Sequence, residues 1–173
     1  MRKFTVRNLT FAAAVAALYA VLGYFGDIFG LTFGAVQFRF AEALTVLPFL
    51  FPAAAPGLAI GCLIVNLASP VGPLDIVFGT LATAVAAWLT MKMPRWYLAA
   101  LPPIVMNALL LPPMWAWAEA GALNGAFWAA YGFNMWTFVV GEAVACYVLG
   151  TVLLKALPKI KYLRGMMPRH RLA

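Results

Sequence analysis

Long apolar stretches, broken only by short segments rich in glycine, proline or basic residues, run through the whole chain. Of its 173 residues, 65% are hydrophobic and 10% are charged, whereas a soluble domain carries about 25% charged residues. Disordered proteins are charge-rich and poor in apolar residues, so disorder is excluded as well. Because an apolar stretch of about 20 residues spans a bilayer, we predict an all-α integral membrane protein with a single transmembrane domain over residues 1–173.

Six of these stretches are predicted to be transmembrane helices. Their approximate ranges are 9–25, 39–51, 57–67, 75–91, 97–117 and 133–154, followed by a basic tail at 155–173. The second and third are shorter than a standard span, so we expect them to be tilted, broken or buried among the others. The first also has the basic start and alanine-rich core of a secretory signal, but no convincing cleavage site follows it.

The positions of the basic residues predict the orientation. Apart from Arg39, they lie near the N-terminus, in the hinge at residues 92–95 and in the C-terminal tail. Cytoplasmic segments of membrane proteins carry an excess of Lys and Arg, and an even number of spans returns the chain to its starting side. We therefore expect both termini and the hinge to be cytoplasmic. The net charge of +7 then reflects membrane anchoring, and nucleic acid is not an expected partner.

Charged side chains inside the predicted spans are the first candidates for a binding site, because a charge at the centre of a membrane helix costs about 2.5–3.5 kcal/mol to insert. Arg39 and Glu42 are three residues apart and share one helical face, where they form either an internal ion pair or part of a ligand site. Glu142 lies about eight residues into the sixth span and either binds a ligand or bonds to neighbouring helices. Asp75 opens the fourth span and either caps that helix or lies at the outer mouth of a pocket.

Amide and aromatic side chains extend this set. Asn66 and Asn107 either bridge helices or bind donors and acceptors of a ligand. Asn134 and Phe138 share the helical face of Glu142, and this alternation of rings and hydrogen-bonding groups suits a planar polar ligand. The cluster of Trp115, Trp117 and Trp128 favours an aromatic belt at the membrane boundary over ligand stacking.

Small residues recur every fourth position in the first span, at Ala12, Ala16 and Ala20. Such a stripe lets a second helix approach closely. It serves either packing inside the molecule or, if it faces outward, the docking of a membrane partner.

Motifs of several enzyme classes are missing from the sequence. There is no G-x-x-x-x-G-K-[ST] loop with which the chain could power transport by its own ATPase. The single histidine, His170, lies in the basic tail, which argues against a metal centre or a His-based catalytic site. We expect neither a cofactor nor enzymatic activity.

The segment V-Q-F-R-F-A-E-A-L-T-V-L-P at residues 36–48 resembles the signature of QueT-type transporters. These are substrate-binding S components of energy-coupling factor (ECF) transporters for queuosine precursors. Further matches follow in the same order along the chain, at Pro56-Gly57, Gly61-Cys62, Asn66, Asp75, Gly79, Ala82-Thr83, Pro102-Pro103, Asn107, Gly141-Glu142 and residues 147–150.

The resemblance implies a six-helix S component in the prokaryotic plasma membrane, with a pocket that opens outward under the loop at residues 27–37. It implies that the alanine stripe docks on a transmembrane coupling subunit, which works with two cytosolic ATPases. The implied ligand is a queuosine precursor or queuine, both 7-deazaguanine bases.

A carboxylate can accept the ring N–H and the exocyclic amine of such a base side by side. Glu142 is the sequence-based choice for this role, and Asn66 and Asn107 would make the remaining hydrogen bonds to the edge of the base. Phe138 or Trp136 would stack on the ring. An aminomethyl cation, where the ligand has one, would meet Asp75 or Glu42.

Two other functions use the same buried polar residues. A stand-alone channel or facilitator for another small solute would take up its cargo without ATP. An intramembrane enzyme would use Glu42 or Glu142 as an acid–base group and would turn over its ligand.

Overall fold

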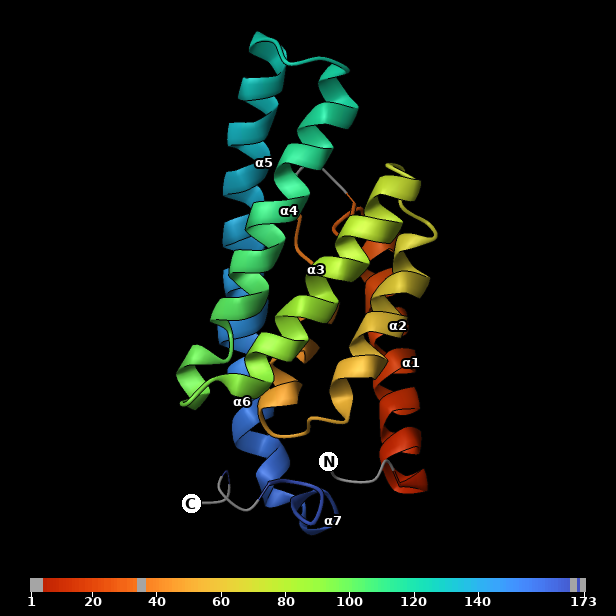
Figure 1. Ribbon diagram of the computed structural model, residues 1–173, viewed down its shortest axis with the longest axis vertical. Helices are drawn as coiled ribbons and strands as arrows, with labels where there is room; N and C mark the ends of the chain where they lie inside the picture. The colour runs from red at the N-terminus through yellow and green to blue at the C-terminus, as the bar shows by residue number, and fades with distance from the viewer. Residues whose placement is uncertain (1–4, 34–36, 169–170, 172–173) are drawn as a thin grey trace.

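The computed structural model describes residues 5–33, 37–168 and 171. Within these residues the chain is helical and has no β-strand, as predicted. Residues 34–36 of the expected capping loop, the basic Arg2 and Lys3, and His170 lie outside the described residues. The elements, shown in Figure 1, are α1 (Val6–Ile28), the 3₁₀ helix η1 (Phe40–Phe49), α2 (Ala54–Asn66), α3 (Pro73–Lys92), η2 (Trp96–Leu98), α4 (Leu101–Ala120), α5 (Gly125–Ala143), the π-helical η3 (Val144–Leu149), α6 (Gly150–Ala156), η4 (Leu157–Lys159) and α7 (Lys161–Arg164).

Four segments of the described chain are long and apolar enough to cross a bilayer, namely 6–28, 73–92, 96–120 and 125–159. They correspond to the first, fourth, fifth and sixth predicted spans. The predicted second and third spans form η1 and α2, with 10 and 13 residues. From the rise per residue of 3₁₀ and α-helices, each covers only about 20 Å of a hydrocarbon core about 30 Å thick.

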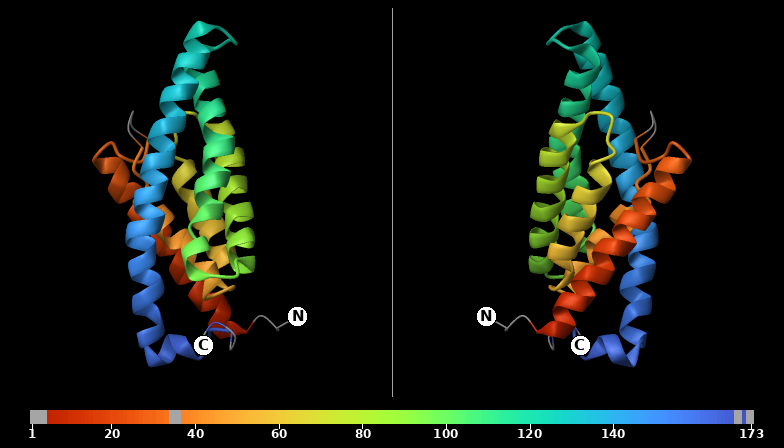
Figure 2. Two further views of the ribbon diagram at one scale, coloured as in Figure 1. Left: turned by 90° about the vertical axis from the view of Figure 1, so that its left-hand side faces the viewer. Right: turned by 90° about the vertical axis from the view of Figure 1, so that its right-hand side faces the viewer.

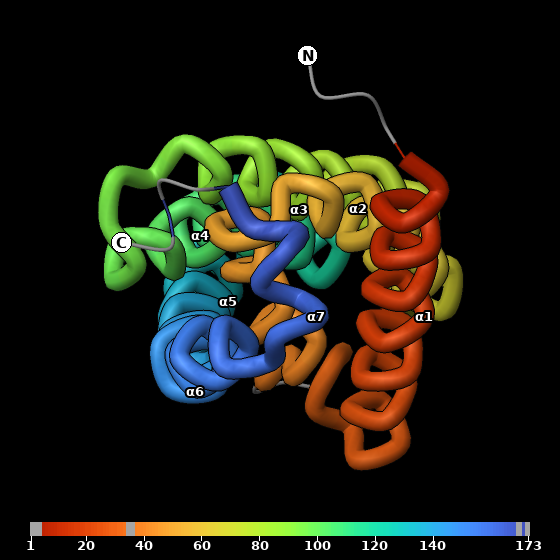
Figure 3. Tube along the Cα trace, turned by 90° about the horizontal axis from the view of Figure 1, so that it is seen from below, coloured from red at the N-terminus to blue at the C-terminus, as the bar shows by residue number. Residues whose placement is uncertain are grey.

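The short helix η1 lies in the middle of the molecule. It packs against α1, α3 and α6, and all of its residues from Ala41 to Phe49 are buried. In the view along the long axis, η1 (orange) lies between α1 and α6 (Figure 3). Pro48 inside it lacks the N–H that a regular helix would use. Such backbone is tolerated at membrane depth because protein, and not lipid, surrounds it.

Helices α4 and α5 form an antiparallel hairpin that extends beyond the other helices at one end (Figure 2). The helix that contains the predicted sixth span, 133–154, starts earlier than that span, at Gly125. Its first turn is capped by the side chain of Asn124, which accepts a 3.0 Å hydrogen bond from the N–H of Phe127. α4 ends at Ala120 and is capped by Gly121, whose φ of 67° is the left-handed conformation that glycine adopts readily.

Most of the described basic side chains lie at one end of the molecule, and three of the five acidic ones lie towards the other. The start of α1, the hinge between α3 and α4, and the C-terminal helices share one end, here called the basic end (Figure 1). Its described basic residues are Arg7, Lys92, Arg95, Lys155, Lys159, Lys161, Arg164 and Arg171. Asp27, Asp75 and Glu119 belong to helix ends at the opposite side (Figure 1).

The alanine stripe of α1 packs inside the molecule. Ala12 and Ala16 are 5% and 7% exposed, and Ala20 is partly buried. A Cβ placed on Gly57 of α2 would overlap the carbonyl oxygen of Ala12, and one on Gly61 would meet that of Ala16. The stripe therefore lets α1 and α2 approach closely. Its predicted role as an outward docking surface is wrong, because a second helix of the same chain already covers it.

We expect Gly57→Ala to destabilise the protein by about 1–3 kcal/mol, because the added methyl group would force α2 away from the backbone of α1. The free energy of unfolding, measured by titration with a denaturing detergent, checks this. Gly132→Ala is the matched control, because nothing lies within 4 Å of a Cβ at that helical position. Equal stability of the two variants would contradict the close α1–α2 contact.

Candidate functional site

A cluster of buried polar side chains lies between the helices. It draws on residues from η1 and the segment before it, α2, α3, α4 and α5, and each member is at most 4% exposed: Arg39, Glu42, Asn66, Asp75, Asn107 and Glu142. We call these six residues the polar cluster. All six were predicted as site residues from the sequence, and the hydrogen bonds described below link five of them into two branches, while the Glu42 side chain bonds to Tyr19.

Arg39, Asn66 and Asp75 form the first branch. The guanidinium of Arg39 donates a 3.0 Å hydrogen bond to the side-chain oxygen of Asn66. The Asn66 amide in turn donates to the backbone carbonyl of Asp75 at 3.0 Å. A Cβ at Gly79 would lie 2.6 Å from the Asn66 nitrogen and 2.8 Å from an Asp75 carboxylate oxygen, so the absence of a side chain there makes room for this branch.

Asp75 does not cap α3 through its side chain. The capping position is Gly72, which makes no side-chain cap bond. Neither carboxylate oxygen of Asp75 has a hydrogen-bond partner among the described residues, although the residue is fully buried. Its place in the first turn lets the helix dipole stabilise the negative charge, while both oxygens stay free to accept donors.

Glu42 and Arg39 do not form the ion pair that was one of the predicted alternatives. No salt bridge joins them in the described part of the chain: Arg39 binds Asn66, while Glu42 accepts a 2.5 Å hydrogen bond from the hydroxyl of Tyr19. The reason is local, because Arg39 precedes η1 in an extended conformation and does not share its helical register. The second carboxylate oxygen of Glu42 has no partner among the described residues.

Glu142 and Asn107 form the second branch, across the α4–α5 hairpin. Asn107 donates a 2.9 Å hydrogen bond to one carboxylate oxygen of Glu142, and the thiol of Cys146 lies 3.7 Å from the other. The same thiol donates to the backbone carbonyl oxygen of Glu42 at 3.4 Å, and this contact connects the second branch to η1. Glu142 lies near the middle of the continuous helix 125–159, much further from its start than the predicted eight residues.

Gln37 approaches the second branch through a glycine. A Cβ on Gly141 would overlap the carbonyl oxygen of Gln37. The Gln37 side chain is 3% exposed, and its oxygen has no partner in the described chain. This residue was not singled out from the sequence, although it lies within the family-like segment.

Three aromatic rings pack together beside Arg39 of the polar cluster. Phe33 and Trp115 stack with their centroids 6.4 Å apart and an angle of 16°, and Phe138 meets Trp115 edge-on at 6.5 Å. The guanidinium of Arg39 lies 6.0 Å from the centre of the Phe33 ring. The indole N–H of Trp115 is buried without a described partner. The expectation that Trp115 belongs to a membrane belt is wrong, because the ring is 9% exposed.

Two other predicted site residues lie away from the polar cluster. Trp136 is 69% exposed on the outer face of α5, so its predicted stacking on a ligand bound by Glu142 is wrong. Asn134 is buried, but its amide donates a 3.0 Å hydrogen bond to Glu119 towards the end of the hairpin. Of the predicted α5 stripe, Phe138 and Glu142 therefore reach the cluster.

The residues missed from the sequence carry weak periodic signals. Trp115 is eight residues after Asn107 on α4, which places both on one helix face. Tyr19 lies on the buried face of α1 with Ala12 and Ala16. A buried hydroxyl on a face of small residues indicates a polar partner on the opposite helix, here Glu42.

The polar cluster and its aromatic side offer many hydrogen-bond acceptors and few donors. Five fully buried oxygens lack a described partner, from Gln37 beside the cluster, Glu42, Asp75 (two) and Asn107, against one such nitrogen, that of Trp115. Arg39 adds the N–H donors that it does not give to Asn66. Three carboxylates, those of Glu42, Asp75 and Glu142, face a single guanidinium. An unpaired buried polar group costs about 1–3 kcal/mol. The arrangement can therefore bind a flat molecule that supplies several donors or a positive charge. In the described residues no three His, Cys, Asp or Glu side chains are placed to hold a metal ion.

Comparison with known proteins identifies the family of the chain. No curated protein and no solved structure is similar enough to match the chain. The model of the family described as QueT transporter matches residues 9–159, which includes the whole polar cluster. With its long apolar helices, the protein is a transmembrane transport protein, and the chain belongs to the QueT transporter family.

Proposed function

We propose that this protein is the substrate-binding S component of an ECF-type importer that takes up a queuosine precursor or queuine. The observation that carries the proposal is the surplus of buried acceptor oxygens beside stacked aromatic rings. A 7-deazaguanine is flat and presents a ring N–H and an exocyclic amine on one edge. Membership of the QueT transporter family supports the same substrate class.

Asp75 is the best placed carboxylate for the donor edge of the base. Both of its oxygens are free, so it can accept the ring N–H and the exocyclic amine side by side. Glu142, the sequence-based choice, already accepts from Asn107 and Cys146. We assign Glu142 the task of orienting Asn107, whose free oxygen accepts a further donor.

The other members of the cluster bind the remainder of the ligand. The indole N–H of Trp115 donates to the carbonyl of the base, and the Phe138 ring covers its face. The free oxygen of Glu42 accepts from a cationic group. Because three carboxylates face one guanidinium, the site favours a 7-aminomethyl cation over a neutral 7-cyano group.

The proposal includes an orientation in the prokaryotic plasma membrane. All six apolar segments cross or enter the bilayer, with η1 enclosed by the longer helices and α2 packed between α1 and α3 with its other face exposed. The basic end faces the cytoplasm, in keeping with the preference of Lys and Arg for that side. The polar cluster then receives its ligand from outside.

A coupling subunit and two cytosolic ATPases complete the transporter in this proposal. The sequence holds no P-loop of its own, so energy must come from partners. Ala13 and Ala17 lie on the exposed face of α1, opposite the buried stripe. They give that face the small side chains that allow a membrane helix to approach.

Uptake of labelled 7-aminomethyl-7-deazaguanine into proteoliposomes tests the proposal. We expect uptake only when the coupling subunit and both ATPases are reconstituted with the protein and ATP is supplied on their side. The protein alone should bind the base without transporting it. Equal uptake without the ATPases or ATP would instead identify a stand-alone facilitator, and failure to bind any 7-deazaguanine would remove the proposed substrate.

A further inference from the structure

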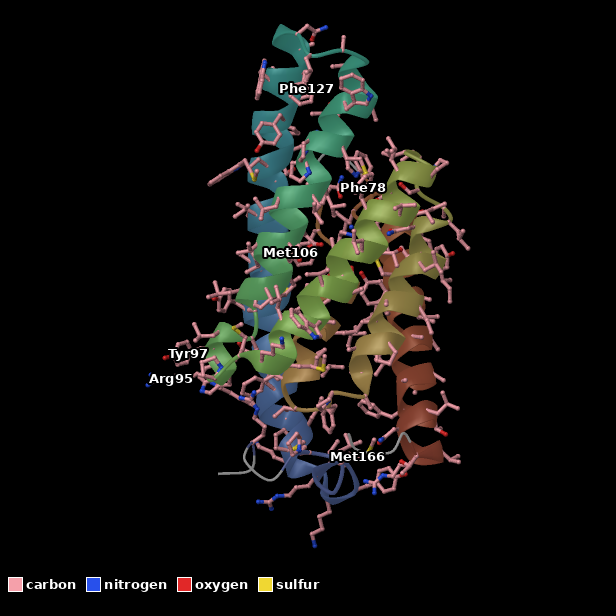
Figure 4. All side chains as sticks on the ribbon, viewed as in Figure 1. Phe78, Arg95, Tyr97, Met106, Phe127 and Met166 are labelled. Carbon is pink, nitrogen blue, oxygen red and sulfur yellow. The ribbon has the colours of Figure 1, made fainter. Side chains whose placement is uncertain are left out.

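A cavity lies far from the polar cluster, at the basic end. It has a volume of about 460 Å³ and is formed by the end of η1, the hinge at residues 94–97, the α6–η4 segment and Arg171. Figure 4 labels Arg95 and Tyr97, which project from this end of the molecule. Segments distant in the sequence are joined here, because Arg171 donates hydrogen bonds to the carbonyl oxygens of Met91 and Pro94 at 3.2 and 3.4 Å.

Three cationic side chains line this cavity, from Arg95, Lys155 and Arg171. Each is supported by an aromatic ring. The Lys155 ammonium lies 5.0 Å from the centre of Trp96, the Arg95 guanidinium 5.8 Å from that of Tyr97, and the Arg171 guanidinium 4.0 Å from that of Phe49. Arg95 also donates a 2.7 Å hydrogen bond to the Tyr97 hydroxyl.

No acidic side chain neutralises these cations. The sequence contains five Asp and Glu residues. Glu42, Asp75 and Glu142 are buried in the polar cluster, and Asp27 and Glu119 lie near helix ends on the opposite side. Three cations around one cavity therefore attract an anion, and each retains N–H donors for it, because a guanidinium has five and an ammonium three.

We propose that this cavity binds the phosphate headgroup of an anionic phospholipid. The cavity recognises a phosphate monoanion. We assign this phosphate to a membrane lipid because the cavity opens where a transmembrane protein meets the bilayer surface. Trp96 and Tyr97 at its rim are 44% and 41% exposed, as is typical of side chains at the headgroup level. Basic pockets between transmembrane helices are known binding sites for such headgroups.

The shape and lining of the cavity fit a lipid better than a small free anion. Apolar side chains of Phe49, Leu50, Leu154 and Pro158 form the rest of its wall. These side chains can contact a glycerol backbone and the start of an acyl chain. Inorganic phosphate has no such groups and would leave this apolar wall uncovered. A bound lipid would tie the C-terminal segment, η1 and the hinge together at this end.

Native mass spectrometry of the detergent-purified protein tests this site. We expect phosphatidylglycerol to remain bound in preference to phosphatidylcholine with the same acyl chains. The double variant Arg95→Gln/Lys155→Gln should lower the affinity for phosphatidylglycerol by about tenfold. Both side chains are exposed, so the variant should fold, which an unchanged melting temperature verifies.

The matched control is Lys159→Gln/Lys161→Gln. It removes the same charge from exposed positions at the basic end that do not line the cavity, and it should change the affinity by no more than about twofold. Equal losses in the two double variants would overturn the proposal in favour of general surface charge, and no loss in either would overturn it too. Displacement of the lipid by equimolar glycerol 3-phosphate would show that the site takes a soluble phosphate instead.

Discussion

Asp75→Asn is expected to weaken binding of 7-aminomethyl-7-deazaguanine by about 1.5–3 kcal/mol, or roughly 10- to 150-fold. The substitution replaces one of two free acceptor oxygens by an NH₂ group, which opposes a ligand donor. It also removes one of the negative charges that favour a cationic ligand. Isothermal titration calorimetry on the purified protein measures the change directly.

The effect on binding can be separated from an effect on folding. The Asp75 side chain has no described hydrogen bond, and the Asn66 amide binds its backbone carbonyl, which the variant keeps. Glu119→Gln is the control, because it makes the same change of a carboxylate to an amide at a position away from the polar cluster. Unchanged affinity of folded Asp75→Asn would exclude Asp75 from the site. A greater loss of affinity in Glu142→Gln would mean that Glu142, and not Asp75, binds the donor edge of the base.

The sequence was sufficient to predict the helical class, the approximate helical segments and the members of the polar cluster. In an apolar chain, a charged or amide side chain is conspicuous, so Arg39, Asn66 and Glu142 could be selected without a structure. The partners could not be predicted. Arg39 binds Asn66 on another helix and not Glu42, three residues away, because the chain before η1 is extended, and sequence spacing reports only on regular helices.

Errors arose where one residue type serves two environments. Alanine suits both a helix–helix contact inside the chain and a docking surface. The pattern at Ala12 and Ala16 therefore does not predict whether a helix of the same chain or of a partner packs there. Tryptophan is common both at membrane boundaries and in binding sites. Only the position of Trp115 against Phe33 and Phe138 distinguishes the two. The early start of α5 was not predicted because its first residue is Gly125, and glycine is a poor helix former. The capping residue Asn124 marks the start in the structure.

Ala17→Leu is expected to abolish ATP-dependent uptake while leaving ligand affinity unchanged. Ala17 is exposed on the free face of α1, where a larger side chain would keep a partner helix of the coupling subunit at a distance. The buried Tyr19, which binds Glu42, lies on the other face and is not disturbed. Reconstituted uptake and calorimetry on the same preparation measure the two properties separately.

Two further alanine substitutions make this result specific to the exposed face of α1. Ala129→Leu adds the same bulk to an exposed position on α5 and should leave uptake intact, because that helix is not expected to dock. Ala16→Leu should instead lower the stability of the protein, because its side chain would enter the close contact between α1 and Gly61. Normal uptake by Ala17→Leu would place the docking surface elsewhere on the molecule. Loss of uptake in Ala129→Leu alone would move it to α5, whereas loss of binding in Ala17→Leu would mean that the two faces of α1 are not independent.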